Sequence, residues 1–241
     1  MTGASRGIGR AIATLLSESG SEVLIHFNTN VEEARSLQRS LSGPSHLVPC
    51  DLADVAQVSG WLPDLVEKFG RIDAVVNNAG VAISVPMDAD TEDWLHVWNE
   101  TMTVNATSLA IICKEFVEHA IANLNGRIVN ISSRAAFRGD TSDYLAYGAS
   151  KAAIVGITRT IARYYGKKGV KAFLIAPGFT RTDMAQDFFD QYGEQYALND
   201  IALNQLTEPK DIAPFVALLC SGLADHATGC TIDINAGSYV H

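Results

Sequence analysis

Short apolar runs alternate with longer helical patterns along nearly the whole chain, and this alternation constrains the fold more than any other feature. The runs span residues 22–27, 46–49, 72–76, 127–132, 170–175 and 231–234, and most of them are continuously apolar. Continuous apolar runs of this length are typical of parallel strands that helices cover on both faces. The alternation therefore predicts a doubly wound parallel sheet, a Rossmann-type fold with three α/β/α layers.

Helical patterns fill the intervals between the predicted strands. They span residues 8–19, 31–41, 55–69, 91–123, 143–168 and 209–221. A chain of 241 residues suits one domain, which we place at 1–241. Residues 184–206 break the rhythm and carry four aromatic side chains. We expect this segment to cover the substrate, and the alternative is that it packs on a neighbouring subunit.

Charge and cysteine content exclude several classes of function. The net charge is −9, and no run of Lys or Arg exceeds the pair Lys167-Lys168, which argues against a nucleic-acid partner. No apolar run approaches the roughly 18 residues that a membrane span needs, so we expect no membrane partner. The four cysteines lie far apart and form no C-x-x-C, so we assign no metal site. These features are typical of a cytoplasmic protein.

The stretch T-G-A-S-R-G-I-G near the N-terminus fits two kinds of site. It contains G-x-S-x-G, the turn that exposes a nucleophilic serine in hydrolases, with Ser5 as nucleophile and His226 as a late histidine. No residues before the motif supply the oxyanion amide of a hydrolase, which disfavours this interpretation. Alternatively, Gly3 allows a tight turn while Gly7 and Gly9 let backbone N–H groups approach a pyrophosphate. The spacing departs from the usual G-x-G-x-x-G.

A second group of residues carries chemistry. Tyr147 and Lys151 are four residues apart, so a helix over 143–168 places the phenol and the ammonium on one face. Ser133 follows the predicted strand 127–132, at the edge of the sheet where doubly wound folds bind ligands. A phenol with a reference pKa near 10 is a weak base at neutral pH, and a neighbouring ammonium would stabilise its phenolate.

Taken together and in chain order, these motifs resemble the classical short-chain dehydrogenase/reductase family. The matching stretches are T-G-A-S-R-G-I-G at 2–9, N-N-A-G at 77–80, N-I-S-S at 130–133, Y-x-x-x-K at 147–151 and P-G at 177–178. The resemblance spans essentially the whole chain, and its layout is most similar to the 3-oxoacyl-[acyl-carrier-protein] reductase group. It implies hydride transfer between a nicotinamide and a carbonyl or alcohol carbon, and a homotetramer.

The resemblance also implies catalytic roles. Tyr147 would donate and accept the proton, Lys151 would lower the pKa of the tyrosine and bind the nicotinamide ribose, and Ser133 would polarise the carbonyl. Ser132 is the alternative serine, and we prefer Ser133 because the family's catalytic serine is the second of this pair. Asn105 would support the active-site helix and complete a proton relay, and its alternative is an ordinary helix asparagine.

Cofactor contacts follow from the same resemblance. The implied residues are Gly3, Ser5, Arg6, Gly7, Ile8, Gly9, Asn28, Asp51, Leu52, Asn78, Ala79, Gly80, Tyr147, Lys151, Pro177, Gly178, Thr180 and Thr182. Enzymes that select NAD usually place an acid after the second strand, whereas residues 26–30 here read H-F-N-T-N. With no carboxylate there and Arg6 able to pair with a 2′-phosphate, the pattern indicates NADP(H).

The substrate is less constrained than the reaction. A small carbonyl or alcohol compound is expected, and an acyl-carrier-protein thioester is one candidate. An acidic carrier protein needs basic residues near the site, and Lys167 and Lys168 could serve, whereas residues 118–124 contain no Lys or Arg. Other ketones, quinones or sugars stay open as substrates. A non-catalytic dinucleotide sensor is a further alternative, which the presence of Ser133, Tyr147 and Lys151 disfavours.

The first strand of the family's sheet raises a separate expectation. In the family it precedes the glycine turn and lies in the middle of the sheet, between the strands predicted at 22–27 and 72–76. Only Met1 and Thr2 precede Gly3 here. Loss of a central strand would cost on the order of 10 kcal/mol, which is comparable with the stability of a whole domain. We therefore expect the natural polypeptide to have residues upstream.

Overall fold

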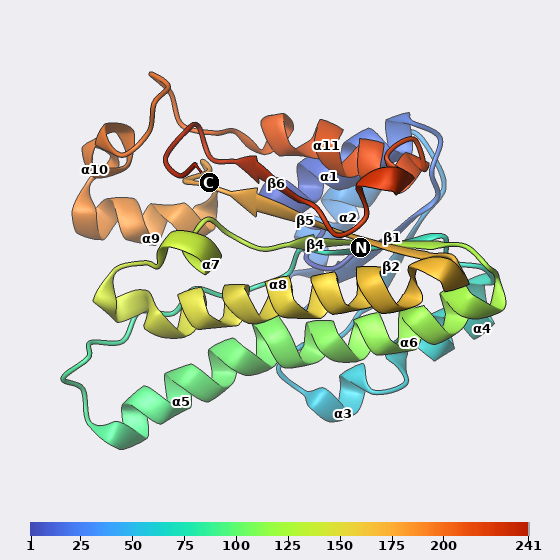
Figure 1. The fold of residues 1–241 in the computed structure, drawn as a ribbon, viewed down its shortest axis with the longest axis horizontal. Coiled ribbons are helices and arrows are strands. Elements are labelled where there is room, and N and C mark those ends of the chain that lie inside the picture. The colour runs from blue at the N-terminus through green and yellow to red at the C-terminus, as the bar shows by residue number, and fades with distance from the viewer. Residues whose placement is uncertain (241) are drawn as a thin grey trace.

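The strands form a parallel sheet with helices on both faces (Figure 1). The computed structural model describes residues 1–240, without the side chains of residues 187 and 191. Strand β1 (Val23–Phe27) pairs with β2 (Ser45–Pro49). A four-stranded sheet has the order β3 (Ala74–Asn77), β4 (Gly126–Ile131), β5 (Val170–Pro177) and β6 (Thr231–Ile234). The predicted doubly wound Rossmann-type fold is confirmed.

Residues 1–4 join the two groups of strands. On one side, the N-terminal amino group of Met1 donates to Leu24 O at 2.9 Å, and His26 N donates to Met1 O at 3.1 Å. On the other side, Thr2 N donates to Val76 O at 2.9 Å. This short segment therefore lies between β1 and β3, the place that the sequence predicts for the residues before the glycine turn.

His26 fastens the start of the glycine turn to β1 and to the end of β2. Its Nδ1 accepts a hydrogen bond from Gly3 N at 3.0 Å, which leaves Nε2 to donate to Cys50 O at 3.0 Å. The indole of Trp61 contacts the imidazole ring edge to face, with 5.2 Å between centroids. Burial lowers the pKa of His26 to about 4, so the ring is neutral at physiological pH.

Helices cover the sheet in two layers (Figure 1). Helices α1 (Gly7–Glu18), α2 (Val31–Ser40) and α11 (Pro209–Ser221) lie on one face. On the other face lie α3 (Val55–Val58), α4 (Trp61–Phe69), α5 (Thr91–Met102), α6 (Ser108–Ala122) and α8 (Leu145–Tyr165). Short 3₁₀ turns, Ser142–Tyr144 and Gly166–Lys168, flank α8. The layers match the expected α/β/α arrangement.

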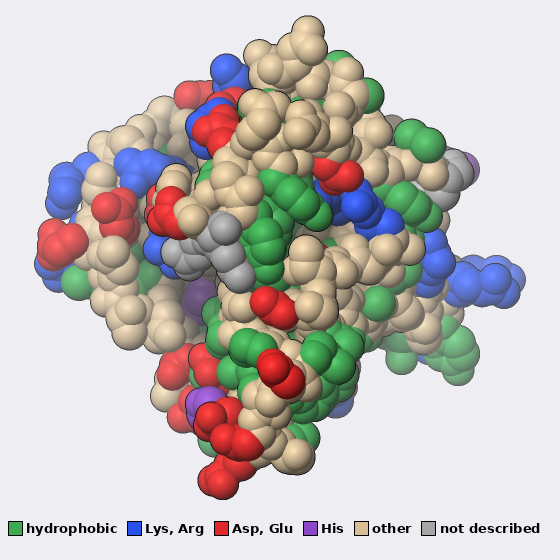
Figure 2. Space-filling view, turned by 90° about the vertical axis from the view of Figure 1, so that its left-hand side faces the viewer, with side chains coloured by type: hydrophobic (Ala, Val, Ile, Leu, Met, Phe, Trp, Pro, Cys, Tyr) green, Lys and Arg blue, Asp and Glu red, His purple; other side chains and the backbone are tan. Residues whose placement is uncertain are grey.

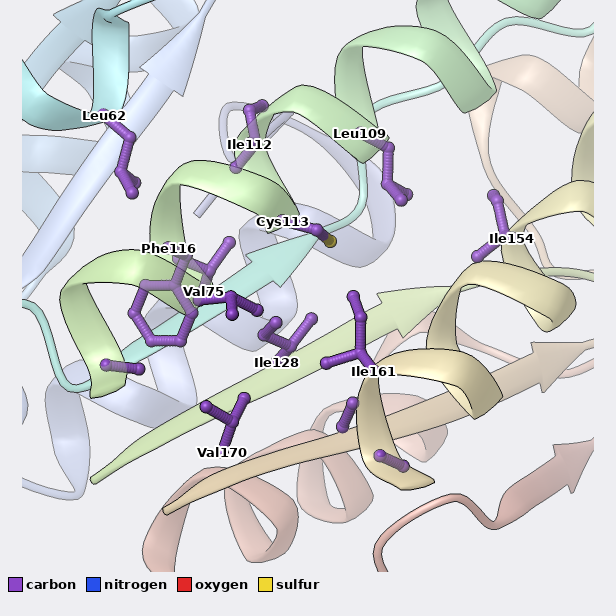
Figure 3. Close-up of a cluster of buried hydrophobic side chains, with 14 of the residues drawn as sticks. Leu62, Val75, Leu109, Ile112, Cys113, Phe116, Ile128, Ile154, Ile161 and Val170 are labelled. Atoms are coloured by element: carbon purple, nitrogen blue, oxygen red, sulfur yellow. The ribbon is translucent and has the colours of Figure 1, made fainter. Parts of the chain in front are cut away.

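The core on the second face is packed between α6, α8 and strands β3 to β5 (Figure 3). Phe116 and Ile112 of α6, Ile154 of α8 and Ile128 of β4 are almost completely buried. Burial of each such side chain stabilises the fold by about 1.5–3 kcal/mol. This packing fixes α8 against β4, which matters because α8 carries Tyr147 and Lys151 and because Ser133 follows the end of β4.

Two predicted helices are interrupted in the structure, and the segment 184–206 folds into helices. Residues 55–69 form two helices because Gly60 adopts a left-handed conformation with φ of 88°, and Glu115 accepts the hydrogen bond from Gly60 N. Residues 91–123 are interrupted by a π-helical turn, Thr103–Thr107.

Residues 184–206 contain most of α9 (Asp183–Tyr192) and all of α10 (Glu194–Asn199), which lie beyond the carboxyl ends of the strands near α7 (Ala135–Arg138).

None of the helices in the described part of the chain combines the length and the hydropathy that crossing a bilayer requires.

The buried His26 makes stability sensitive to acid. In the unfolded chain its pKa is about 6.5, whereas in the folded protein it is about 4. Between these values the unfolded state binds a proton that the folded state excludes, so the free energy of unfolding should decrease as pH falls from about 6.5 to about 4. Urea unfolding at pH 7, 6 and 5 measures this slope. His26→Gln should flatten it and the exposed His96→Gln should not; equal slopes in all three proteins would contradict the assignment.

Candidate active site

One cavity of about 620 Å³ lies at the carboxyl ends of the strands and brings most of the predicted site together. A volume in this range accommodates a large organic ligand. The cavity is lined by Ser133 and by every residue that the sequence analysis assigned to the cofactor, from Gly3 in the glycine turn to Thr182. Asn105 is the single predicted residue that does not line it.

The glycine turn is shaped for a close approach to a ligand. Gly3 and Gly7 have φ angles of 58° and 51°, a conformation that side chains disfavour. A Cβ at Gly9 would overlap the carbonyl oxygen of Gly3 and lie 2.7 Å from Asn78 Nδ2. Helix α1 begins at Gly7, and no acidic residue or side-chain cap occupies its first turn. Its free N–H groups can therefore bind a phosphate, and the turn fits a dinucleotide.

The turn is held in place from the end of β3. The Thr2 hydroxyl accepts hydrogen bonds from the backbone N–H groups of Asn78 at 2.9 Å and Ala79 at 3.1 Å. In return, Asn78 Nδ2 donates to the carbonyl oxygens of Thr2 at 3.2 Å and Gly3 at 2.9 Å. The glycine turn and the N-N-A-G motif therefore form one hydrogen-bonded unit.

The hydrolase interpretation fails on geometry. Ser5 lines the cavity, but His226 lies in the exposed turn Asp225–Ala227 and is not among the lining residues. The neighbouring Asp225 pairs with Arg127 at the start of β4, which is the opposite end of the sheet from the cavity. Ser5 therefore has no such histidine partner.

Ser133, Tyr147 and Lys151 converge at the cavity. The Ser133 hydroxyl interacts with the phenol of Tyr147 and lowers the pKa of that phenol. Lys151 Nζ lies 5.6 Å from the centroid of the Tyr147 ring and donates to Ile131 O at 3.1 Å. The Ser132 hydroxyl instead donates to the backbone carbonyl of Lys151 at 2.9 Å. Of the two serines, Ser133 is thus the one whose hydroxyl is directed at the tyrosine.

Burial shifts the two titrating groups of this site in opposite directions along the pH scale. It raises the pKa of Tyr147 to about 12, and the interaction with Ser133 offsets only part of this rise. It lowers the pKa of Lys151 to about 8. The phenol is therefore protonated at neutral pH and is ready to act as an acid. An added positive charge at the cavity would be needed to favour its phenolate.

Asn105 lies behind the cavity, in the π-helical turn. Its side chain accepts from Val81 N and donates to Val81 O, both at 2.8 Å, and also donates to Ser150 Oγ at 3.0 Å. Ser150 Oγ donates in turn to the carbonyl of Tyr147 at 2.7 Å. π-helical turns are frequent at functional sites. The asparagine connects the loop after β3 to the helix that carries Tyr147.

The region expected to bind the adenosine ribose carries amides and one arginine. Asn28 Nδ2 donates to Asp51 Oδ1 at 3.2 Å, and both residues line the cavity. No carboxylate occurs among residues 26–30. The Arg6 guanidinium, 70% exposed, lies 3.6 Å from the carboxylate of Asp183 at the start of α9. Arg6 also lines the cavity.

Several residues that line the substrate end of the cavity are not among the site residues predicted from the sequence. They are Ala82, Arg134, Tyr144, Phe179, Met184 and Phe188. Arg134 directly follows Ser133, and Phe179 directly follows the P-G motif, so adjacency to a recognised motif could have identified both. Met184 and Phe188 lie in the segment 184–206, which the sequence predicts to cover the substrate, whereas Ala82 and Tyr144 carry no specific sequence signal. Most of this end is apolar and aromatic.

Figure 2 shows the molecule from the side on which α9 and α10 lie. Hydrophobic side chains gather near the middle of this face, and acidic side chains gather at its lower end, over the start of α5. The exposed residues there include Asp88, Asp90, Glu92 and Asp93. This face does not offer a basic surface around the start of α5.

Comparison with known proteins identifies the class. The profile of a family described as enoyl-(acyl carrier protein) reductase matches residues 3–239. The match includes the glycine turn and the residues around Ser133, Tyr147 and Lys151. The chain belongs to the short-chain dehydrogenase/reductase family.

Individual relatives are similar along their whole length. The chain is 31% identical to the 3-oxoacyl-[acyl-carrier-protein] reductase FabG of Staphylococcus aureus, over 100% of this chain and 97% of that protein. It is 32% identical to FabG of Vibrio cholerae, over 100% and 96% of the two chains. A putative NAD(P)-dependent gluconate 5-dehydrogenase from Beutenbergia cavernae, solved with bound NADP at low occupancy, is 30% identical with a TM-score of 0.89 and coverages of 98% and 94%.

A short-chain dehydrogenase from Burkholderia cenocepacia, solved in complex with NADP, has a TM-score of 0.88 and 30% identity, covering 98% of this chain and 95% of that chain. The fold and the family are therefore the same as in two structures that contain NADP.

The contact between Gly9 and Gly3 gives a stability test. Gly9→Ala should destabilise the protein by about 1–3 kcal/mol and weaken dinucleotide binding, because the added methyl group overlaps the backbone of the glycine turn. Gly156→Ala is the matched control, since nothing lies within 4 Å of a Cβ at this helical position. The control should stabilise by up to about 1 kcal/mol. Unfolding curves for both variants check this, and equal effects would contradict the packing described.

Proposed function

We propose that the protein is an NADP(H)-dependent oxidoreductase that transfers a hydride between nicotinamide and a carbonyl or alcohol carbon. The observation that carries this proposal is the convergence of Ser133, Tyr147 and Lys151 on the same cavity as the glycine turn. A dinucleotide phosphate at the start of α1 and a substrate at Tyr147 would share that cavity.

The residues supply proton transfer and orientation. A bound reduced nicotinamide supplies the hydride that the carbonyl carbon receives. Tyr147, protonated at neutral pH, donates its phenolic proton to the carbonyl oxygen, so one C–H and one O–H bond form. The Ser133 hydroxyl holds that oxygen beside the phenol, and the ammonium of Lys151 stabilises the phenolate that is left. In the reverse direction, Tyr147 accepts the proton from an alcohol.

NADP(H) is the proposed cofactor for three reasons. Residues 26–30 carry no carboxylate that would repel a 2′-phosphate or bond a free 2′-hydroxyl. Arg6 lines the cavity with an exposed guanidinium that can pair with that phosphate. Two structures of the same fold contain NADP.

Two substrate classes follow from the relatives. The relatives from Staphylococcus aureus and Vibrio cholerae are named as 3-oxoacyl-[acyl-carrier-protein] reductases. This name favours an acyl thioester on a carrier protein as the substrate. One structural neighbour is described as a putative gluconate 5-dehydrogenase, which favours a small polyhydroxy acid. The remaining alternative is a dinucleotide sensor, which would bind the cofactor and catalyse no reaction.

The tyrosine gives the test of the reaction. Tyr147→Phe should lower kcat by about 10²–10⁴ while the affinity for NADPH stays within a few fold, because the variant loses the proton donor but keeps the aromatic ring and the other cofactor contacts. Tyr164→Phe, at an exposed tyrosine on the same helix, is the matched control and should turn over normally. NADPH oxidation across a panel of oxo compounds and NADPH fluorescence titration provide the two measurements. Near-normal turnover by Tyr147→Phe would refute the mechanism.

Arg6 gives the test of cofactor choice. The parent protein should prefer NADPH to NADH in kcat/KM, and Arg6→Ala should weaken NADPH binding by about 10-fold with little effect on NADH, because it removes the partner of the 2′-phosphate. Arg35→Ala, on the exposed face of α2, should change neither cofactor. Equal kcat/KM for the two cofactors in the parent would rule out this preference.

A further inference from the structure

A charged cluster of Arg134, Arg138 and Asp200 lies beside the catalytic group, and of these three residues Arg134 lines the cavity. Arg138 Nη1 donates to Asp200 Oδ2 at 2.7 Å, and Arg134 Nη1 donates to the same oxygen. Arg138 also donates to the backbone carbonyl of Ser238 at 3.2 Å. The side chain of Arg134 is only 12% exposed. Two guanidinium groups therefore converge on a single carboxylate oxygen.

Arg134 connects this cluster to the reacting centre. It directly follows Ser133 and lines the cavity. Its guanidinium carbon lies 4.1 Å from the centroid of the Phe179 ring, and Phe179 lines the cavity as well. The positive charge of Arg134 also acts on Tyr147, where it favours the phenolate. Among largely apolar neighbours, this guanidinium is the polar group best placed to orient a substrate.

Asp200 is the carboxylate on which both arginines converge. It lies directly after α10, in the segment 184–206 that covers the substrate end of the cavity. Burial alone would raise its pKa, but the hydrogen bonds from Arg138 and Arg134 hold the pKa below its usual value, so the group is ionised. Asp140 is a second acid at the cavity, and its pKa is raised mainly by burial. The two arginines thus hold the carboxylate of Asp200 at one defined point.

We infer that the substrate is an oxo acid, or the corresponding hydroxy acid, whose own carboxylate binds Arg134 and Arg138 in place of Asp200. This inference rests on the proposed function and specifies its substrate class. Exchange of one carboxylate for another leaves the charge of the cluster unchanged, so no guanidinium is left buried without a partner. Hydrogen bonds between arginine and carboxylate are strong and directional, and they would fix the carbonyl relative to Ser133 and Tyr147.

The inference separates two substrate classes. A 3-oxoacyl thioester carries no charge beside its carbonyl, so it would leave Asp200 on the arginines. An oxo acid would displace Asp200 and with it the end of α10. Specificity would then depend on the free acid, and an ester of the same compound would be a poor substrate.

The experiment compares oxo acids with their methyl esters, over a series in which the separation of carbonyl and carboxylate increases. The parent enzyme should prefer at least one acid to its ester by about 10-fold or more in kcat/KM. Arg134→Gln should lose at least about 10-fold more for that acid than for the ester, because the effect of Arg134 on Tyr147 is common to both substrates. Asp200→Asn removes the internal competitor, so it should lower KM for the acid.

Arg181→Gln is the matched control. Arg181 pairs with Glu194 of the same covering segment at 2.6 Å and with Glu208 at 3.2 Å, but it does not line the main cavity. It should affect acid and ester equally. If Arg134→Gln also affects both equally, or if the parent prefers the esters, Arg134 only anchors the segment and the inference is overturned.

A binding measurement tests the inference independently of the proposed function. Calorimetric titration of the parent with the hydroxy acids requires no turnover, and binding should be lost in Arg134→Gln but kept in Arg181→Gln. Absence of binding to the parent would overturn the inference. Reduction of neutral ketones alone would overturn it while leaving the proposed reductase intact. Failure to reduce any oxo compound, with the hydroxy acids still bound through Arg134, would instead refute the proposed function.

Discussion

The hydrogen bonding of residues 1–4 between β1 and β3 is the constraint on which the site depends. Asn78 donates two hydrogen bonds to Thr2, from its backbone N–H and from its side chain, and His26 Nδ1 accepts a hydrogen bond from Gly3 N. These contacts hold the glycine turn at the place where the two groups of strands meet. The amino end of α1 therefore faces the cavity, and the phosphate-binding geometry follows from the sheet and not from the turn alone.

Burial supplies the second constraint, because it sets the protonation of the site. The packing of α6 and α8 against β3 to β5 places Tyr147 and Lys151 in an environment that disfavours charge on either group. The phenol of Tyr147 is therefore protonated at neutral pH. A positive charge bound in the cavity would favour the phenolate. Asn105 and Ser150 secure the same helix from behind, so that the geometry does not rely on the core alone.

Much of the fold could be predicted from the sequence. The six strands and most helices follow from local periodicity, which reports which side chains are buried. The interruptions could not be predicted in the same way. The break at Gly60 depends on Glu115, which is 55 residues distant in the chain, and the π-helical turn at Asn105 depends on the contact with Val81 across a gap of 24 residues. Such contacts carry no periodic signal.

The sequence by itself determined the family and the candidates for catalysis, because the spacing of Tyr147 and Lys151 and the order of the motifs are properties of the chain. Only the tertiary structure decided that the Ser133 hydroxyl faces the phenol while Ser132 bonds the backbone of α8. It also decided that Arg134 meets Asp200, 66 residues later. Side chains from distant segments meet only where packing places their backbones, and a local pattern contains no information about that distance.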